Sequence, residues 1–291
     1  MRIATSILLF IVTAVGIGAP IHAQRTARPL RALDAPQVLR IGVVNTPDVL
    51  LEDLLPLFTQ QTGYAVSMQI TEGVYDLARE GKIDLVIAHY GHAGTEAFMA
   101  EGLGRWPRMV FSNQAVLIGP AGDPAGIRGL TDAAEAFRRI AQRGGEFFVN
   151  NAPTERYLAE TLWRASGAPP KESWHVDLGL RDQAAIEAAA RRGAYTLWGL
   201  VPFVRLQQQR PTLGMDTLVL GDPLFQRVMV SIIMNPARLP GANIEAALTF
   251  ERFLLDPNTQ ARIRQFRHHG LPAQTWWPAG RQNAGAELTQ F

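Results

Sequence analysis

The sequence predicts an α/β fold of two lobes joined by a double hinge. Segments rich in β-formers alternate with segments of helical periodicity over Leu39–Phe266, a pattern typical of α/β proteins with mixed, mostly parallel sheets. Two extended segments, Met109–Gly119 and Phe225–Met234, are each about twice the length of an ordinary strand. They enclose roughly a hundred residues, about one domain. A chain that crosses twice in this way forms two lobes with a ligand cleft between them, the alternative being one sheet with two long strands.

The first strand and helix provide the first candidate binding turn. Leu39–Val44 is a run of β-formers, and apolar residues recur at helical spacing over Val49–Phe58. Between these segments, Asn45 or Thr46 can cap the helix, and Pro47 suits its first position. The backbone N–H groups at such a helix N-terminus can bind an anion or a polar small molecule. Asn45 and Thr46 are therefore candidate ligand-binding residues, and the alternative is that they only cap the helix.

The remaining elements follow the same alternation. Further strands are predicted at Tyr64–Ile70, Asp84–His89, Phe147–Asn150, Ala194–Trp198 and Thr217–Leu220. Further helices are predicted at Gly73–Gly81, Thr95–Gly102, Leu130–Gln142, Thr154–Ala165, Arg181–Arg192, Val201–Gln209, Ala246–Leu255 and Thr259–Phe266. The aromatic segment Trp276–Pro278 is expected to pack the C-terminal tail onto a lobe.

The N-terminus and the composition predict an exported globular protein. Residues 1–23 have the pattern of a cleaved signal peptide, with Arg2 before the apolar run Ile7–Ile17 and a cleavage site after Ala23. Residues 24–34 are expected to be a flexible leader. The chain has no cysteine, which fits a periplasmic protein without disulfides and excludes thiol chemistry. A net charge of +2, with scattered basic residues, argues against nucleic-acid binding.

Several stretches, in order along nearly the whole mature chain, resemble one family. They include Leu50–Phe58, Gly81–His89, Glu96–Gly104 and Val116–Ile127, the last with the uncommon pattern Gly-Pro-x-x-Asp-Pro-Ala-Gly-Ile. The chain resembles the substrate-binding proteins of tungstate-type ABC importers, within the type II periplasmic binding proteins. The resemblance implies one lobe formed by residues 35–115 plus 228–291 and a second formed by residues 116–227. It also implies a monomer that grips a small ligand, such as tungstate or molybdate, and hands it to a membrane permease.

The chain departs from this family where the resemblance places the ligand. A Thr-Thr-Thr-Ser turn is replaced by Val43–Thr46, and a Gly-Thr-Gly turn by Thr71–Gly73, which adds the carboxylate of Glu72. The family's Ser-Arg-Gly-Asp segment becomes part of Asn150–Tyr157, so the arginine expected to neutralise an anion falls near Asn151, and Arg156 lies one helical turn on. Each hydrogen bond to a charged group is worth about 1.5–3 kcal/mol, so these losses predict weaker oxyanion binding by the same donors.

The candidate ligand-binding residues are Asn45, Thr46, Thr71, Glu72, Asn150, Asn151, Thr154, Arg156 and Trp198. We hypothesise that the protein binds an oxyanion through different donors, or binds a neutral or zwitterionic organic solute. Amides, a carboxylate and an indole face would suit such a solute. The structural alternatives are that Thr71 caps a helix, that the two asparagines form a turn, and that Arg156 makes a surface ion pair.

Other function classes have less support in the sequence. It contains no Gly-x-Ser-x-Gly elbow, phosphate loop, zinc helix signature or dinucleotide fingerprint, so neither an enzyme nor a cofactor is predicted. His89 and His92 lack an acidic partner at metal-ligand spacing, so structural roles are predicted for both. A periplasmic ligand-sensing module with a sensor partner, and an exported enzyme on the same scaffold, stay open as alternatives to transport.

Overall fold

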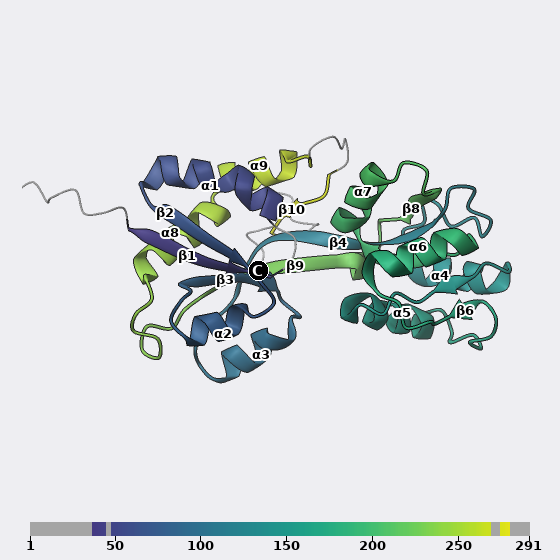
Figure 1. The fold of residues 1–291 in the computed structure, drawn as a ribbon, viewed down its shortest axis with the longest axis horizontal. Helices are drawn as coiled ribbons and strands as arrows, with labels where there is room; N and C mark the ends of the chain where they lie inside the picture. The colour runs from purple at the N-terminus through teal and green to yellow at the C-terminus, as the bar shows by residue number, and fades with distance from the viewer. Residues whose placement is uncertain (1–36, 45–47, 269–273, 280–291) are drawn as a thin grey trace, which may run out of the picture. The chain divides into compact units, whose positions relative to one another are not determined.

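The computed structural model describes residues 37–44, 48–268 and 274–279 (Figure 1). The predicted signal peptide, the predicted leader and the candidate residues Asn45 and Thr46 lie outside these residues. The described residues belong to one compact unit that begins at Pro36. None of the helices in the described ranges is both long and apolar enough to span a membrane.

The first half of the main sheet combines parallel and antiparallel strands. β1 (Val38–Val43) lies between β2 (Ala65–Ile70) and β3 (Leu85–His89) and pairs in parallel with both. β9 (Gln226–Ile233) pairs antiparallel with β3 and with β4 (Arg108–Pro120). Figure 1 shows β4 and β9 side by side, as their register requires.

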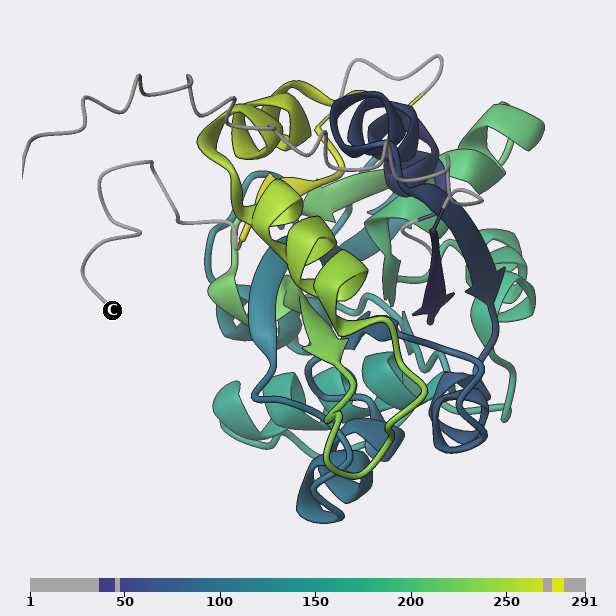
Figure 2. The same ribbon diagram turned by 90° about the vertical axis from the view of Figure 1, so that its left-hand side faces the viewer.

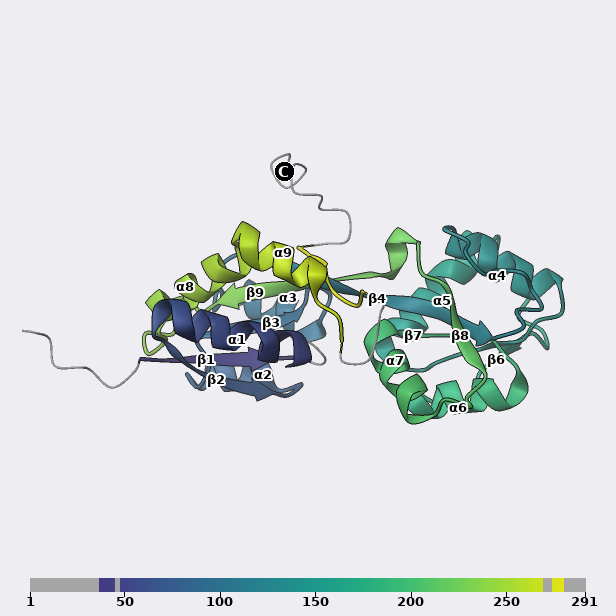
Figure 3. The ribbon, with the colours of Figure 1, turned by 90° about the horizontal axis from the view of Figure 1, so that it is seen from above.

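Helices cover both faces of this half of the sheet. One face packs against α1 (Asp48–Thr62), α8 (Ile244–Leu255) and α9 (Pro257–Gln265), and Phe58 and Phe250 meet edge to face in that core. Figures 2 and 3 show these three helices on the same side of the strands. The other face packs against α2 (Val74–Arg79) and α3 (Ala93–Ala100). The apolar side chains of β1 supply the first core, whereas those alternating along β3 supply both, as expected for a strand buried on two sides.

β4 continues past β9 and pairs with a second set of strands. Its residues from Ala115 onward pair antiparallel with β7 (Thr196–Gly199) and β8 (Met215–Val219). Two short strands that follow β4 in the sequence, β5 (Phe147–Phe148) and β6 (His175–Val176), pair in parallel with each other. One core here includes α4 (Ala133–Gln142) and α5 (Pro153–Ala165), and another includes α6 (Asp182–Arg192) and α7 (Leu200–Gln209).

The predicted α/β class with mixed sheets is confirmed, with two differences in detail. Among the described residues, parallel ladders join β1 to its two neighbours and β5 to β6, and one parallel bridge joins Phe147 to Tyr195, so antiparallel pairs take a larger share than expected. β4 has the predicted length at 13 residues, whereas β9 has 8. The second segment is shorter because Phe225 belongs to the 3-10 turn η1 (Pro223–Phe225), which Asp222 caps through the N–H of Leu224.

The aromatic tail segment packs as predicted. Trp276 is fully buried, and its ring meets Phe111 of β4 edge to face at 5.4 Å between centroids. β10 (Trp277–Pro278) then pairs antiparallel with β4. The tail therefore pairs with the edge of β4 that is opposite to β9.

Gly119 of β4 is a position where any side chain would be overcrowded. A Cβ atom there would lie 2.5 Å from Tyr195 Cδ1 and 2.6 Å from Leu218 Cδ1. Gly119→Ala is therefore expected to lower the free energy of unfolding by about 1–3 kcal/mol, the usual effect of overpacking a core. Urea denaturation measures the change. Gly122→Ala is the matched control, since a Cβ at Gly122 meets no atom within 4 Å, and an equal loss in both variants would contradict the packing explanation.

Candidate functional site

The turn after β2 holds Thr71 and Glu72. The Thr71 N–H donates to the carbonyl of Val43 at 3.0 Å, so this turn adjoins the end of β1. Thr71 Oγ1 accepts a hydrogen bond from the N–H of Gly73 at 3.2 Å, which closes the turn into α2. The side chain of Glu72 is exposed, and its Oε2 lies 3.4 Å from Nε2 of His92. His92 itself caps α3 by accepting from the N–H of Gly94.

Asn150 is buried, and its side chain makes hydrogen bonds to three backbone groups. Its Nδ2 donates to the carbonyl of Leu197 at 3.1 Å, and its Oδ1 accepts from the N–H groups of Ala152 and Asp182 at 3.2 and 2.9 Å. These bonds tie the start of α5 to β7 and to the start of α6. Asn150 therefore has a structural role, and its predicted ligand contact stays a prediction.

Asn151 and Arg156 form a surface network with Asp177. Asn151 Nδ2 donates to Asp177 Oδ1 at 2.7 Å, and Asn151 Oδ1 accepts from Arg156 Nη1 at 2.7 Å. Hydrogen bonds from the Gly179 N–H and from Asn151 lower the pKa of Asp177. Thr154 is exposed in the first turn of α5. Among the described residues, no hydrogen bond or ion pair joins this network to the turn that holds Thr71 and Glu72.

Trp198 lies in the apolar core and not on a binding surface. It is 9% exposed in β7 and belongs to the cluster formed by α6, α7 and β4, which includes Phe203 and Val116. Most of its indole packs within this cluster, and the stacking of its face on a ligand stays a prediction. β7 is mostly buried, and the sequence pattern did not reveal that the side of the strand that carries Trp198 is covered.

Arg227 is the charged residue that the sequence analysis missed. It lies on β9 directly opposite Asn113 of β4, just before β4 begins to pair with β7. Its Nη1 makes a long contact of 3.4 Å with the carbonyl of Gln226. Its Nε and Nη2 are buried and have no hydrogen-bond partner in the part of the chain that the structure describes, and the same holds for Asn113 Oδ1.

His89 and Glu155 are within electrostatic range of Arg227. Burial, together with the charge of Arg227, lowers the pKa of His89 to about 4, so its ring is neutral near pH 7. Its Nδ1 is also buried without a partner among the described residues. Burial raises the pKa of Glu155 from its ordinary 4.5 to about 7, although Arg227 opposes this shift. Burial also lowers the pKa of Arg227, but a guanidinium stays charged in a protein.

These shifts set how the site affects stability with pH. Glu155 keeps its proton in the folded chain when the unfolded chain has lost it, so folding becomes less favourable as pH rises from about 4.5 to about 7. His89 stays neutral in the folded chain when the unfolded chain is protonated, so folding becomes less favourable as pH falls from about 6.5 to about 4. Both groups therefore oppose folding, which is typical of residues kept for a function.

The group around Arg227 can bind an anion. A buried cation with two unused N–H donors is unfavourable unless an acceptor, best a negatively charged one, satisfies it. The neutral ring of His89 can donate from Nδ1 in one of its tautomers. The signal in the sequence was that Arg227 is the single charged residue of the mostly apolar run Phe225–Met234.

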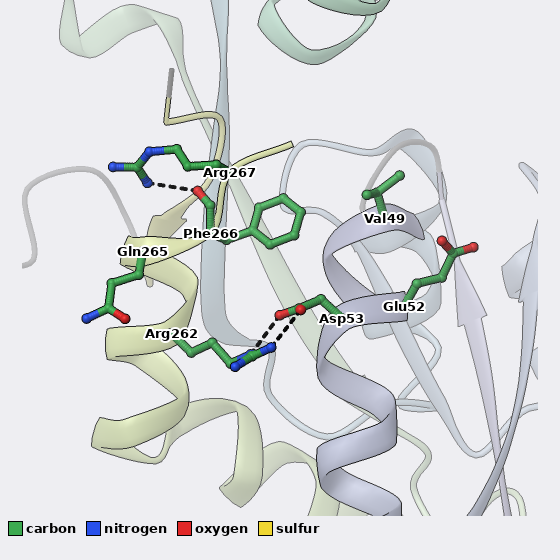
Figure 4. Close-up of a pocket in the computed structure, with 7 residues that line it drawn as sticks. All are labelled: Val49, Glu52, Asp53, Arg262, Gln265, Phe266 and Arg267. Atoms are coloured by element: carbon green, nitrogen blue, oxygen red, sulfur yellow. Dashed lines mark hydrogen bonds and ion pairs between the residues drawn. The ribbon is translucent and has the colours of Figure 1, made fainter. Parts of the chain in front are cut away.

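A separate pocket of about 540 Å³ lies between α1 and α9 (Figure 4). Arg262 and Asp53 face each other there and make two hydrogen bonds of 2.7 Å, while Arg267 Nη1 donates to the carbonyl of Phe266. None of the predicted ligand-binding residues lines this pocket. Its arginines already have partners, so it lacks the unused donors found at Arg227. Within the described residues, no group of three or more His, Cys, Asp or Glu side chains is placed to bind a metal ion.

Comparisons with known proteins agree with this fold. A Haloferax volcanii protein, provisionally named an ABC transporter anion-binding protein, is 31% identical over 253 residues, which cover 83% of this chain and 70% of that protein. The tungstate-binding protein TupA of Peptoclostridium acidaminophilum is 25% identical over 94% of this chain and 97% of its own. The structure of a tungstate-binding protein TupA from Desulfovibrio alaskensis G20 matches with a TM-score of 0.74 and 28% identity, covering 84% of this chain and 99% of that one.

These matches confirm the predicted two-lobed fold of periplasmic binding proteins and the family resemblance. Residues 39–266 also match the family described as bacterial extracellular solute-binding protein. This chain belongs to the family of bacterial extracellular solute-binding proteins.

Proposed function

We propose that this protein captures a small oxyanion outside the cytoplasm and delivers it to the permease of an ABC importer. The observation that carries the proposal is the half-buried Arg227 on β9, whose Nε and Nη2 atoms are buried and unpartnered among the described residues. The names of the relatives support it, since they refer to anion or tungstate binding. Arg227 would thus take over the neutralising role of the family arginine, whose position falls near Asn151 in this chain.

The donors near Arg227 suit an anion better than a neutral or zwitterionic solute. That second hypothesis relied on Trp198 for stacking and on Asn150 for hydrogen bonds. Trp198 is part of the core, and Asn150 already bonds three backbone groups. An oxyanion would receive two charge-assisted hydrogen bonds from Arg227 and a third from neutral His89. Thr71, Glu72, Asn151, Thr154 and Arg156 are then candidates for the rim of the site, together with Asn45 and Thr46.

The remaining parts of the proposal concern location and organisation. We infer export through the signal peptide of residues 1–23 to a periplasmic space, where the protein acts as a monomer and has neither enzymatic nor nucleic-acid-binding activity. We assign residues 35–115 and 228–291 to one lobe and residues 116–227 to the other. The change of pairing partners along β4, from β9 to β7 at Ala115, supports this division.

A thermal-shift screen tests the proposed ligand class. The probes are tungstate, molybdate, sulfate, phosphate and, as neutral or zwitterionic competitors, a set of amino acids. An anion present at 100 times its dissociation constant adds about 2.7 kcal/mol of stability, which corresponds to a rise of about 5–11 °C in melting temperature. Isothermal titration then gives the affinity. A shift with amino acids and none with any anion would contradict the proposal.

A further inference from the structure

Glu155 is a buried acid at the start of a helix. It lies in the first turn of α5, and only 8% of its surface is exposed. Ionised acids in this position are normally favoured by the helix dipole and by the free N–H groups of the first turn. Glutamate is rarely buried to this extent, and here burial raises the pKa of Glu155 to about 7, although a backbone hydrogen bond and the charge of Arg227 both lower it.

Charged groups on two other elements lie within electrostatic range of Glu155. Arg227 on β9 favours the ionised carboxylate, and Asp182 at the start of α6 opposes it. The buried nitrogens of Arg227 nevertheless donate no hydrogen bond to Glu155. Tyr157 of α5 and His89 of β3 also lie within electrostatic range of Arg227, and His92 within range of His89. The carboxyl group therefore belongs to the same charge cluster as Arg227 without being bonded to it.

An anion at Arg227 would change the balance at Glu155. It would bring a second negative charge into the cluster and would use the cation that now offsets the carboxylate. Two negative groups that share one cation in a buried site favour protonation of the weaker acid. A protonated carboxyl group is also a hydrogen-bond donor, whereas a carboxylate only accepts. Protonation of Glu155 would thus remove the repulsion between its carboxylate and the anion, and it would provide an O–H group that can donate to the oxyanion.

We propose that the carboxyl group of Glu155 is part of the anion site and takes up a proton when the anion binds, so that the protein binds an oxyanion together with one proton. This inference rests on the proposed function and names a residue and a linked proton that the function alone does not require. In this step the solvent supplies the proton, the carboxylate oxygen of Glu155 accepts it, and no other covalent bond of the protein or the anion forms or breaks.

The linkage predicts a specific pH profile. Below about pH 7 Glu155 is already protonated, so the affinity for the anion does not change with pH. Above about pH 7 each binding event must take up a proton, so affinity falls by up to tenfold per pH unit until the pKa of the complex is reached. His89, with its pKa near 4, contributes no change in this range. Tungstate and molybdate remain dianions throughout, so they are the probes of choice.

The test is isothermal titration of the full mature protein with tungstate and molybdate between pH 6 and pH 8.5. At pH 8, titration in two buffers of different ionisation enthalpy is expected to show uptake of close to one proton per anion. Glu155→Gln keeps the shape and the donor but cannot titrate, so it is expected to bind equally at all pH values and up to about tenfold more tightly than wild type at pH 8. His92→Asn keeps a capping side chain at α3 and is expected to retain the wild-type profile.

Each remaining outcome is decisive. Anion binding without proton uptake, or identical pH profiles for wild type and Glu155→Gln, would overturn the inference and leave the proposed function intact. Binding of hydrogen phosphate that Glu155→Gln abolishes would also overturn it, because Glu155 would then accept a proton-bearing oxygen of the ligand. Failure of both proteins to bind any anion at any pH would overturn the proposed function and the inference together.

Discussion

Arg227→Met is expected to weaken anion binding by at least ~100-fold. The variant removes the donors Nε and Nη2, which have no protein partner among the described residues. Two charge-assisted hydrogen bonds of about 1.5–3 kcal/mol each exceed the ~2.8 kcal/mol that corresponds to a hundredfold change. Isothermal titration with the anion identified in the screen measures the loss. Arg227→Lys keeps the charge without the planar fork, so its affinity for the anion is expected to lie between those of wild type and Arg227→Met.

The same variant is expected to be at least as stable as wild type in the absence of anion. It replaces an unsatisfied buried cation with an apolar side chain of similar length, which is often neutral or stabilising. The control is Arg164→Met on α5, because Arg164 is a mostly exposed arginine paired with Glu160 at the surface. Unchanged affinity in Arg227→Met, or an equal loss in Arg164→Met, would show that Arg227 does not bind the ligand.

Asp84→Asn is expected to destabilise the protein by about 3–5 kcal/mol, the usual cost of breaking a buried charge pair. Asp84 is fully buried before β3, and its two oxygens accept from the backbone and side chain of Arg40 and from the N–H of Asn243. The hydrogen bond from Arg40 to Asp84 raises the pKa of that arginine. These contacts join β1, β3 and the start of α8. At about 2–4 °C per kcal/mol, the melting temperature should fall by at least about 6 °C.

Asp53→Asn provides the matched control for this prediction. Asp53 also makes two hydrogen bonds to one arginine, Arg262, but both side chains are partly exposed. A surface pair of this kind contributes less than about 1 kcal/mol. Thermal denaturation followed by circular dichroism compares the two variants. Equal shifts would mean that the burial of Asp84 does not set the size of the effect.

The fold could be predicted because its signals are local. Runs of β-formers and helical spacing reflect burial within one element, so β1, β3, β4 and the helices lie where the periodicity indicated. The end of β9 was less predictable, because Phe225 is drawn into a turn by the cap that Asp222 provides. Antiparallel pairing of β9 was also invisible to periodicity, since a strand buried on both faces reads the same in either direction.

The site was harder to predict because its features are non-local. Asn150 looked like a ligand residue, but its Oδ1 bonds the N–H of Asp182, 32 positions away. Trp198 looked available, but its burial depends on α6 and α7 together. Arg227 on β9 is visible in the sequence only as a lone charge in its strand, and nothing in the sequence shows that Glu155 on α5 lies within electrostatic range of it. Hydrogen-bond satisfaction across the fold, and not residue type, separates structural residues from functional ones here.

The continuity of β4 limits how this chain can vary in length. β4 pairs with β9 through Gln114 and with β7 from Ala115. One inserted or deleted residue at this junction would exchange the inward and outward side chains of everything beyond it in the strand. Surface turns such as the one at Gly122 carry no such constraint. Insertions and deletions in relatives of this protein should therefore fall outside Arg108–Pro120, which makes this strand the natural anchor for aligning distant members of the family.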